Sequence, residues 1–216
     1  MYLRSLAAVR NASLSASPPR PFWNYFGVAP YYHKGRTHAD ATEAQARWQV
    51  SASLAFGARG LLYFFFTPNP RKVSLDGPEW PGLVRDDGPA DHPTEHWYQA
   101  RRLNTAVMAL APTLMKLRST KTLVLRETDA RHGGGYTALQ GSGCGLRNIS
   151  TGDFIIGCFV REDGPSSPLG AAGGSWSRAV LIANYEFGFT QVICRSLWRA
   201  SACAVRPMSC ASMPCQ

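Results

Sequence analysis

The sequence predicts an α/β fold that contains part of a (β/α)8 barrel, followed by a small antiparallel β module. Segments with strand and helix character alternate between residues 22 and 117, which is typical of a parallel sheet. Residues 60–66 form a nearly continuous apolar run, as expected of a strand that is buried on both faces. After residue 120, short segments are separated by glycine-rich turns and show no helical period.

The first part of the chain contains a predicted helix, an aromatic strand and a capped second helix. Residues 2–12 have a helical apolar pattern, and residues 22–26 are rich in the aromatic side chains that strands favour. Thr42 and Gln45 have the spacing of a capping box, so a helix is expected to begin there. Gly57 suits the left-handed position that follows a helix.

A long irregular segment precedes the clearest helix of the sequence. Residues 67–93 are rich in proline and glycine and predict a loop. Residues 96–117 carry leucines and other apolar residues at helical spacing. Pro112 lies inside this pattern and predicts a kink or a break. Residues 122–126 then predict a strand.

The chain is expected to divide into three parts. Residues 1–120 form the barrel part, and residues 121–191 form an incomplete, β-sandwich-like module in which 153–160 and 178–185 pair. Residues 192–216 form an irregular tail rich in cysteine that contains no acidic residue. One hypothesis is that this tail is out-of-frame or unspliced sequence, and the other is that it is a genuine part of the protein.

Composition and charge restrict the classes of partner. Hydrophobic residues make up 45% of the 216, which is enough for a core. The net charge of +9 invites a nucleic-acid interpretation, but Lys and Arg are scattered and no run of five occurs. No apolar run approaches the roughly 20 residues that span a bilayer. We therefore expect neither a nucleic-acid nor a membrane partner.

Motifs for metal ions and other cofactors are missing from the sequence. The six cysteines include no C-x-x-C pair, and the histidines are scattered through loops. Fingerprints for dinucleotides, phosphates, zinc proteases and serine hydrolases are absent. We expect no metal site and no cofactor.

Two motifs resemble parts of a known enzyme family. The first lies within residues 43–66 and the second within residues 82–104. They consist of Arg47-Trp48-Gln49 and Leu54-Ala55-Phe56-Gly57-Ala58-Arg59-Gly60, then Gly82-Leu83-Val84, Asp86-Asp87-Gly88, Tyr98 and Leu103-Asn104. Their order is similar to that of the seventh helix, eighth strand and last helix of glycoside hydrolases such as the family 42 β-galactosidases. The resemblance covers about residues 20–118.

The resemblance implies the C-terminal portion of a TIM-type barrel and a parent activity of O-glycosidic bond hydrolysis. A retaining glycosidase needs two carboxyl groups about 5–5.5 Å apart. In this group of enzymes the acid/base follows strand four, which has no counterpart here. The nucleophile follows strand seven, which corresponds to Asn24, Tyr25 and Phe26, and none of these is a carboxylate. We therefore assign no catalytic residue and expect a truncated, catalytically incompetent fragment.

Aromatic residues of the same region are candidates for contact with carbohydrate. Sugar rings present apolar C–H faces on which aromatic rings stack. The predicted substrate-binding residues are the aromatic Trp23, Tyr25 and Trp80, together with Asn24 at the same strand end. The competing interpretation is that the aromatic side chains pack in a core.

Two other functions remain open from the sequence alone. A noncatalytic carbohydrate-binding protein would retain the aromatic contacts without the carboxyl pair, and a basic nucleic-acid binder is the less favoured alternative. A barrel fragment would also expose strand edges, so a partner chain that covers these edges is a further expectation.

Overall fold

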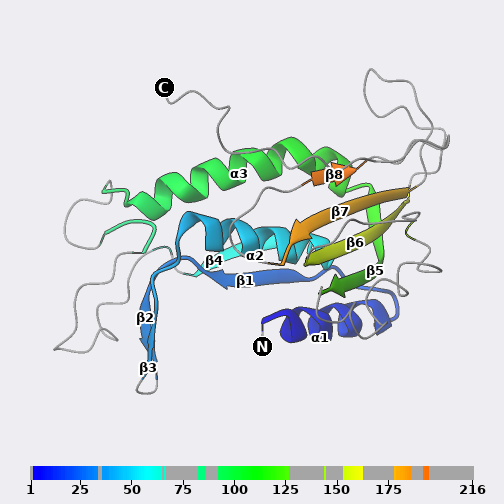
Figure 1. Cartoon of the computed structure of the whole chain (residues 1–216), viewed down its shortest axis with the longest axis horizontal. Helices are drawn as coiled ribbons and strands as arrows, with labels where there is room; N and C mark the ends of the chain where they lie inside the picture. Colours follow the sequence, from blue (N-terminus) through cyan, green and yellow to red (C-terminus); the bar gives the residue numbers. More distant parts are fainter. Residues whose placement is uncertain are drawn as a thin grey trace. The chain divides into compact units, whose positions relative to one another are not determined.

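The structure is a computed structural model, shown in Figure 1. It describes residues 2–33, 36–64, 66, 82–85, 92–126, 144, 153–162, 178–185 and 192–194. Its contacts divide the chain into two compact units, Met1–Lys116 and Leu117–Gln216.

In its described residues, the first unit combines three helices with two small sheets (Figure 1). Strands β1 and β4 are parallel neighbours, with Trp23 opposite Gly60, and β2 and β3 form an antiparallel pair. The elements in chain order are α1 (Tyr2–Ser15), β1 (Trp23–Gly27), β2 (Tyr31–His33), β3 (Arg36–His38), α2 (Glu43–Ala55), β4 (Gly60–Phe64) and α3 (Glu95–Leu114).

The predicted portion of a (β/α)8 TIM-type barrel is wrong. Among the described residues only β1 and β4 run parallel, and they form a two-stranded sheet. The run 60–66 is also not buried on both faces, since Leu62 is 42% exposed. The alternation of strand and helix correctly predicted that β1 and β4 are parallel neighbours. It does not determine how many strands the sheet contains. An apolar run, likewise, does not show whether its second face is covered.

Helix α2 begins and ends where the sequence predicts. The Thr42 hydroxyl accepts a hydrogen bond from the Gln45 amide at 3.2 Å, and the Gln45 side chain accepts one from the Thr42 amide at 2.9 Å. This reciprocal pair satisfies two backbone donors that a helix start leaves open. At the other end Gly57 has a φ of 88°, a conformation that costs glycine little. The capping box and the glycine stop are thus confirmed.

Helix α3 continues through Pro112 to Leu114, so the predicted break does not occur. Pro112 lies in the last turn, where the loss of its N–H removes only one backbone bond near the helix end. Arg59 supports this end, because its guanidinium donates to the Leu114 carbonyl at 2.6 Å. None of the helices in the described ranges is both long enough and apolar enough to cross a bilayer.

The second unit contains one antiparallel sheet in the order β5-β6-β7-β8. The predicted pairing of 153–160 with 178–185 is confirmed, with Ile156 opposite Ile182. The strands are β5 (Leu117–Leu125), β6 (Phe154–Arg161), β7 (Arg178–Asn184) and β8 (Val192–Cys194). Strand β5 is longer than predicted, and β8 lies in the segment that the sequence suggested was irregular.

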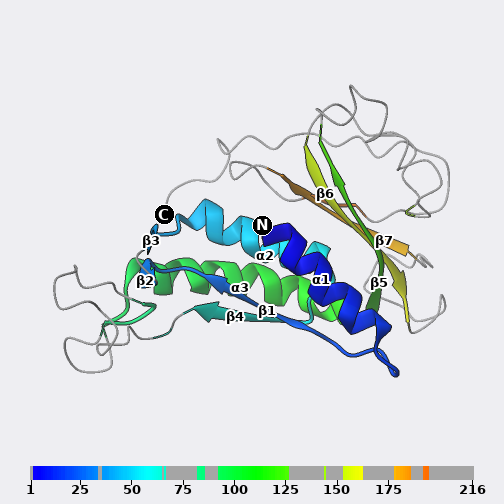
Figure 2. The same ribbon diagram turned by 90° about the horizontal axis from the view of Figure 1, so that it is seen from below.

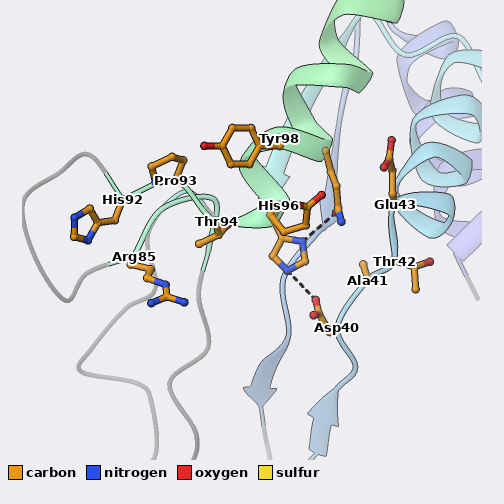
Figure 3. A pocket seen from close by; sticks show the side chains of 12 residues that line it. Asp40, Ala41, Thr42, Glu43, Arg85, His92, Pro93, Thr94, His96 and Tyr98 are labelled. Carbon is orange, nitrogen blue, oxygen red and sulfur yellow. Dashed lines mark hydrogen bonds and ion pairs between the residues drawn. The ribbon is translucent and has the colours of Figure 1, made fainter. Parts of the chain in front are cut away.

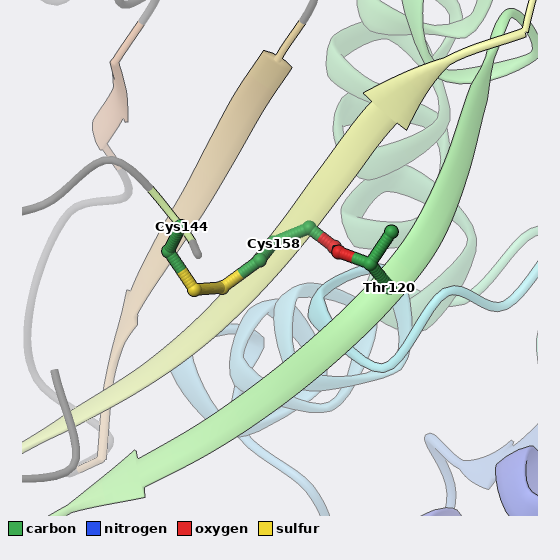
Figure 4. The surroundings of a disulfide bond; sticks show 3 residues. All are labelled: Thr120, Cys144 and Cys158. Carbon is green, nitrogen blue, oxygen red and sulfur yellow. A yellow bond between two sulfur atoms is a disulfide. The ribbon is translucent and has the colours of Figure 1, made fainter. Parts of the chain in front are cut away.

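A disulfide joins Cys144 to Cys158 in the core of this sheet (Figure 4). Both cysteines are at most 2% exposed. The apolar side chains of their cluster are Leu123, Leu125, Ile156, Val180 and Ile182, with Phe154 packed against it. The Thr120 hydroxyl donates to the Cys158 carbonyl at 3.0 Å and ties β5 to β6. The sequence did not predict this bond, since isolated cysteines do not reveal their pairing.

Replacing Thr42 with Ala should lower the free energy of unfolding by about 1 kcal/mol, because it removes the side-chain acceptor of the capping box. Urea titration followed by circular dichroism measures the change. The matched control is Thr105→Ala, which removes an exposed hydroxyl inside α3 that donates to the Arg101 carbonyl of its own helix. Equal losses in the two variants would contradict a specific role of the cap.

Removal of the disulfide by the double change Cys144→Ala and Cys158→Ala should destabilise the second unit. The bond closes a loop with a sequence separation of 14. A loop of this size restricts the unfolded chain by roughly 3 kcal/mol. Denaturant unfolding of the oxidised protein and the double variant measures the loss. A reductant should add no further change to the variant's unfolding midpoint, and an unchanged midpoint between the two proteins would contradict the role of the bond.

Candidate functional site

Strand β1 presents two large aromatic side chains to solvent. Trp23 is 62% exposed and Tyr25 is 56% exposed. Successive side chains of a strand point to opposite faces, so these two share one face of the sheet. Leu62 of β4 lies opposite Tyr25 and is 42% exposed on the same face. We call the surface formed by Trp23, Tyr25, Leu62 and Phe64 the aromatic face.

Figure 2 shows α2 and α3 on one side of β1 and β4. Asn24, which alternates with Trp23 and Tyr25 along β1, donates to Ser53 of α2, so this covered side is the face opposite the aromatic face. The residues of β1 that alternate with Trp23 and Tyr25 agree with this arrangement. Phe26 is 2% exposed, and its ring lies 4.9 Å from that of Tyr63 on β4.

Trp23 lies against the backbone of β4 because its partner there is a glycine. Gly60 is opposite Trp23 in the parallel register. A Cβ atom placed on Gly60 would overlap three atoms of the Trp23 indole ring. The hydrogen of glycine therefore allows the indole to rest on the strand. The exposure of Trp23 shows that much of the same ring faces solvent.

Tyr25 is positioned by its neighbours on β4. Its ring packs edge-on against Phe64, with the ring centres 5.1 Å apart and the planes at 68°. Such tilted pairs are favourable for aromatic rings and restrict their rotation. On the β1 side, the aromatic face therefore presents two supported rings that follow each other along the strand.

The predicted residue Asn24 lies on the opposite face. Its side-chain amide donates to the Tyr2 hydroxyl and to the Ser53 hydroxyl, each at 2.7 Å. Asn24 thus connects β1 to α1 and α2. The structure places Trp23 and Tyr25 on one face of β1 and Asn24 on the other, whereas Trp80 lies outside the described residues.

The covered face also holds β4 to α3. The Tyr63 hydroxyl donates to the side-chain carbonyl of Asn104 at 2.7 Å. Burial raises the pKa of Tyr63 to about 12, so this hydroxyl keeps its proton at neutral pH. This hydrogen bond fixes the position of β4 relative to α3.

In addition to the aromatic face, the first unit has a polar hollow of about 870 Å³ at the first turns of α2 and α3 (Figure 3). Its most enclosed ionisable group is His96, which is 8% exposed. The Nε2 atom of His96 lies 2.9 Å from an Asp40 carboxylate oxygen, and its Nδ1 atom lies 3.2 Å from the Gln99 side-chain oxygen. Both ring nitrogens are engaged by neighbours, so His96 fastens the start of α3 to the segment before α2.

The carboxylates of this hollow are held by ion pairs. Glu43 lies 2.9 Å from Arg47 and 2.8 Å from Arg102, and Arg102 also lies 3.0 Å from Glu95. The hydrogen bond from Arg102 is the main reason that the pKa of Glu43 is lowered. A general acid of a glycosidase needs the reverse, a raised pKa. The network therefore suits a structural connection between α2 and α3.

The described residues include no group of three His, Cys, Asp or Glu side chains placed to hold a metal ion. Five other acidic residues of the predicted loops lie outside the described residues, namely Asp76, Glu79, Asp86, Asp87 and Asp91.

Sequence reasoning missed the β4 side of the aromatic face. Gly60, Leu62 and Phe64 were assigned to a strand buried on both faces. Their role follows from the parallel register, which places each of them beside a residue of β1. The alternation within β1 was visible in the sequence, but the pairing partner of each residue was not.

No family model, curated protein or solved structure matches this chain.

Replacing Arg102 with Ala should raise the pKa of Glu43 toward the ordinary value of 4.5, because Arg102 supplies the largest stabilisation of this carboxylate. A lowered native pKa stabilises the fold above the ordinary carboxyl pKa, and this contribution is lost as the pH falls through the native value. Titration of the Glu43 carboxyl by NMR measures the shift. Arg101→Ala is the control on the same helix and should leave this pKa unchanged. An equal effect of both changes would contradict the assignment.

Proposed function

We propose that this chain binds carbohydrate through its aromatic face and does not hydrolyse it. The observation that carries the proposal is the pair of exposed, supported rings of Trp23 and Tyr25 along β1. Aromatic faces attract the apolar C–H faces of sugar rings by burying them from water. The resemblance of residues 43–66 and 82–104 to glycoside hydrolases supports the same class of ligand.

Core packing, the competing interpretation of these aromatic residues, accounts for Phe26 but not for Trp23 and Tyr25. Phe26 is 2% exposed, whereas more than half of each of the other two is open to water. Single exposed apolar residues are common on protein surfaces and need no explanation. Here, however, Trp23 and Tyr25 are joined by Leu62 in one register-matched patch.

The proposal of binding without hydrolysis rests on the partners of the carboxylates at the hollow. Glycoside hydrolysis in most families requires a carboxylic acid that keeps its proton and a second, ionised carboxylate nearby. The acidic residues at the hollow, Asp40, Glu43 and Glu95, are each paired with a basic side chain. Strand β1 itself supplies no carboxylate to the aromatic face.

Replacing Trp23 or Tyr25 with Ala should weaken carbohydrate binding by about tenfold, since each change removes one stacking surface. A glycan array identifies a ligand, and isothermal titration then gives the dissociation constants. The matched control is Trp97→Ala, because Trp97 is also exposed, at 38%, but lies on α3 and contacts Phe66. The control should bind like the unmodified chain.

Two results would contradict the proposal. One is the absence of binding to any glycan on the array by a protein whose circular dichroism shows that it is folded. The other is steady release of sugar from chromogenic glycosides, which would show that the chain hydrolyses what it binds.

A further inference from the structure

We infer that the aromatic face binds an extended, uncharged polysaccharide that lies flat along β1, and that Gly60 positions Trp23 for this contact. This inference rests on the proposed function and specifies its ligand. It concerns the length, shape and charge of the carbohydrate rather than whether carbohydrate binds.

The spacing of Trp23 and Tyr25 along β1 favours a chain over a single sugar. Trp23 and Tyr25 are two residues apart on one strand. A strand rises about 3.3 Å per residue, so the two side chains leave the backbone about 6.6 Å apart. This separation is comparable to the length of one sugar unit in a linear chain. Neighbouring units can therefore stack on neighbouring rings, and a monosaccharide can cover only one of them.

The shape of the surface favours a flat ligand. Sites that recognise a small molecule by its outline enclose most of its surface. Trp23, Tyr25 and Leu62 instead remain 62%, 56% and 42% exposed and form an open surface. The indole of Trp23 rests on the backbone at Gly60, which keeps it low against the sheet. A flat chain can contact both rings at once without an enclosing wall.

The charge of the surface favours a neutral ligand. All residues of β1 and β4 are uncharged, although the chain as a whole carries +9. The nearest cation in the sequence is Arg59, and its guanidinium bonds to the Leu114 carbonyl at the end of α3. An acidic polysaccharide would find no cation among the described residues of the two strands to compensate its charge. A neutral polysaccharide has no charge to desolvate on this surface.

Binding of neutral linear oligosaccharides of one to six units tests the inference. The oligosaccharides are taken from the neutral glycans that the array identifies, and isothermal titration measures each affinity. We expect at least a tenfold gain between one unit and three, followed by a plateau once both rings are covered. An acidic polysaccharide of similar length should bind at least tenfold more weakly than the neutral one.

The change Gly60→Ala tests the role of the glycine. Its Cβ would overlap the indole of Trp23, so the ring must tilt away from the strand, and the affinity for the longer oligosaccharides should fall about fivefold or more. Gly27→Ala is the matched control, since Gly27 lies at the other end of the same face of β1 and a Cβ there meets nothing within 4 Å. Neither glycine has a positive φ, so alanine can adopt the backbone conformation at both positions.

The outcomes separate this inference from the proposed function. Equal affinity for one unit and six, preference for the acidic chain, or equal binding by the Gly60 and Gly27 variants would overturn the inference while carbohydrate binding stands. Absence of binding to every glycan would overturn both. A dimer in sedimentation velocity that Trp23→Ala dissociates, without any glycan binding, would also overturn both and show that a second copy of the chain covers the aromatic face.

Discussion

The exposure of the aromatic face depends on the contact that fixes the inner face of β1. Asn24 donates to the hydroxyls of Ser53 on α2 and Tyr2 on α1. Side chains alternate along a strand, so a shift of one residue would move every side chain to the other face. Such a shift would bury Trp23 and Tyr25 and would move the Asn24 amide away from both hydroxyls. Hydrophobicity alone does not determine which face of β1 is buried, because both faces carry apolar side chains. The hydrogen bonds of Asn24 therefore determine which face lies against the helices.

The same region explains why a short strand pair is held firmly by its helices. Ser53 also donates to the Gln49 carbonyl, and the Gln49 side chain donates to the Gly27 carbonyl at the end of β1. Buried polar groups beneath a sheet lower the stability of the fold unless they are hydrogen-bonded. Here the hydrogen bonds join β1 to the neighbouring helices or lie within α2. Phe26 and Tyr63 supply the apolar part of the same layer. The inner face is thus specified by polar pairing and by packing together, which leaves the outer face free to carry large aromatic rings.

Local features of the fold could be predicted from the sequence, and features that depend on distant partners could not. The capping box at Thr42 and the glycine stop at Gly57 involve residues within a few positions of each other. The pairing of β6 with β7 followed from two clear strand patterns. The number of parallel strands, by contrast, depends on which segments meet in space, and an apolar strand at 60–66 is compatible with a barrel and with a two-stranded sheet. The Cys144–Cys158 bond was missed for the same reason.

The candidate site shows this division within a single strand. Sequence reasoning selected Trp23 and Tyr25 as aromatic rings and Asn24 as a residue of the same strand end. Their physical roles differ, because adjacent residues of a strand face opposite sides. In the proposed site, what sets Trp23 apart is the glycine across the sheet, which leaves room for its ring to lie flat. Exposed apolar side chains of a helix, such as Met108 of α3, have no cross-strand neighbour to support them in this way. The pairing of Trp23 with Gly60 is therefore the feature on which the proposed binding surface depends.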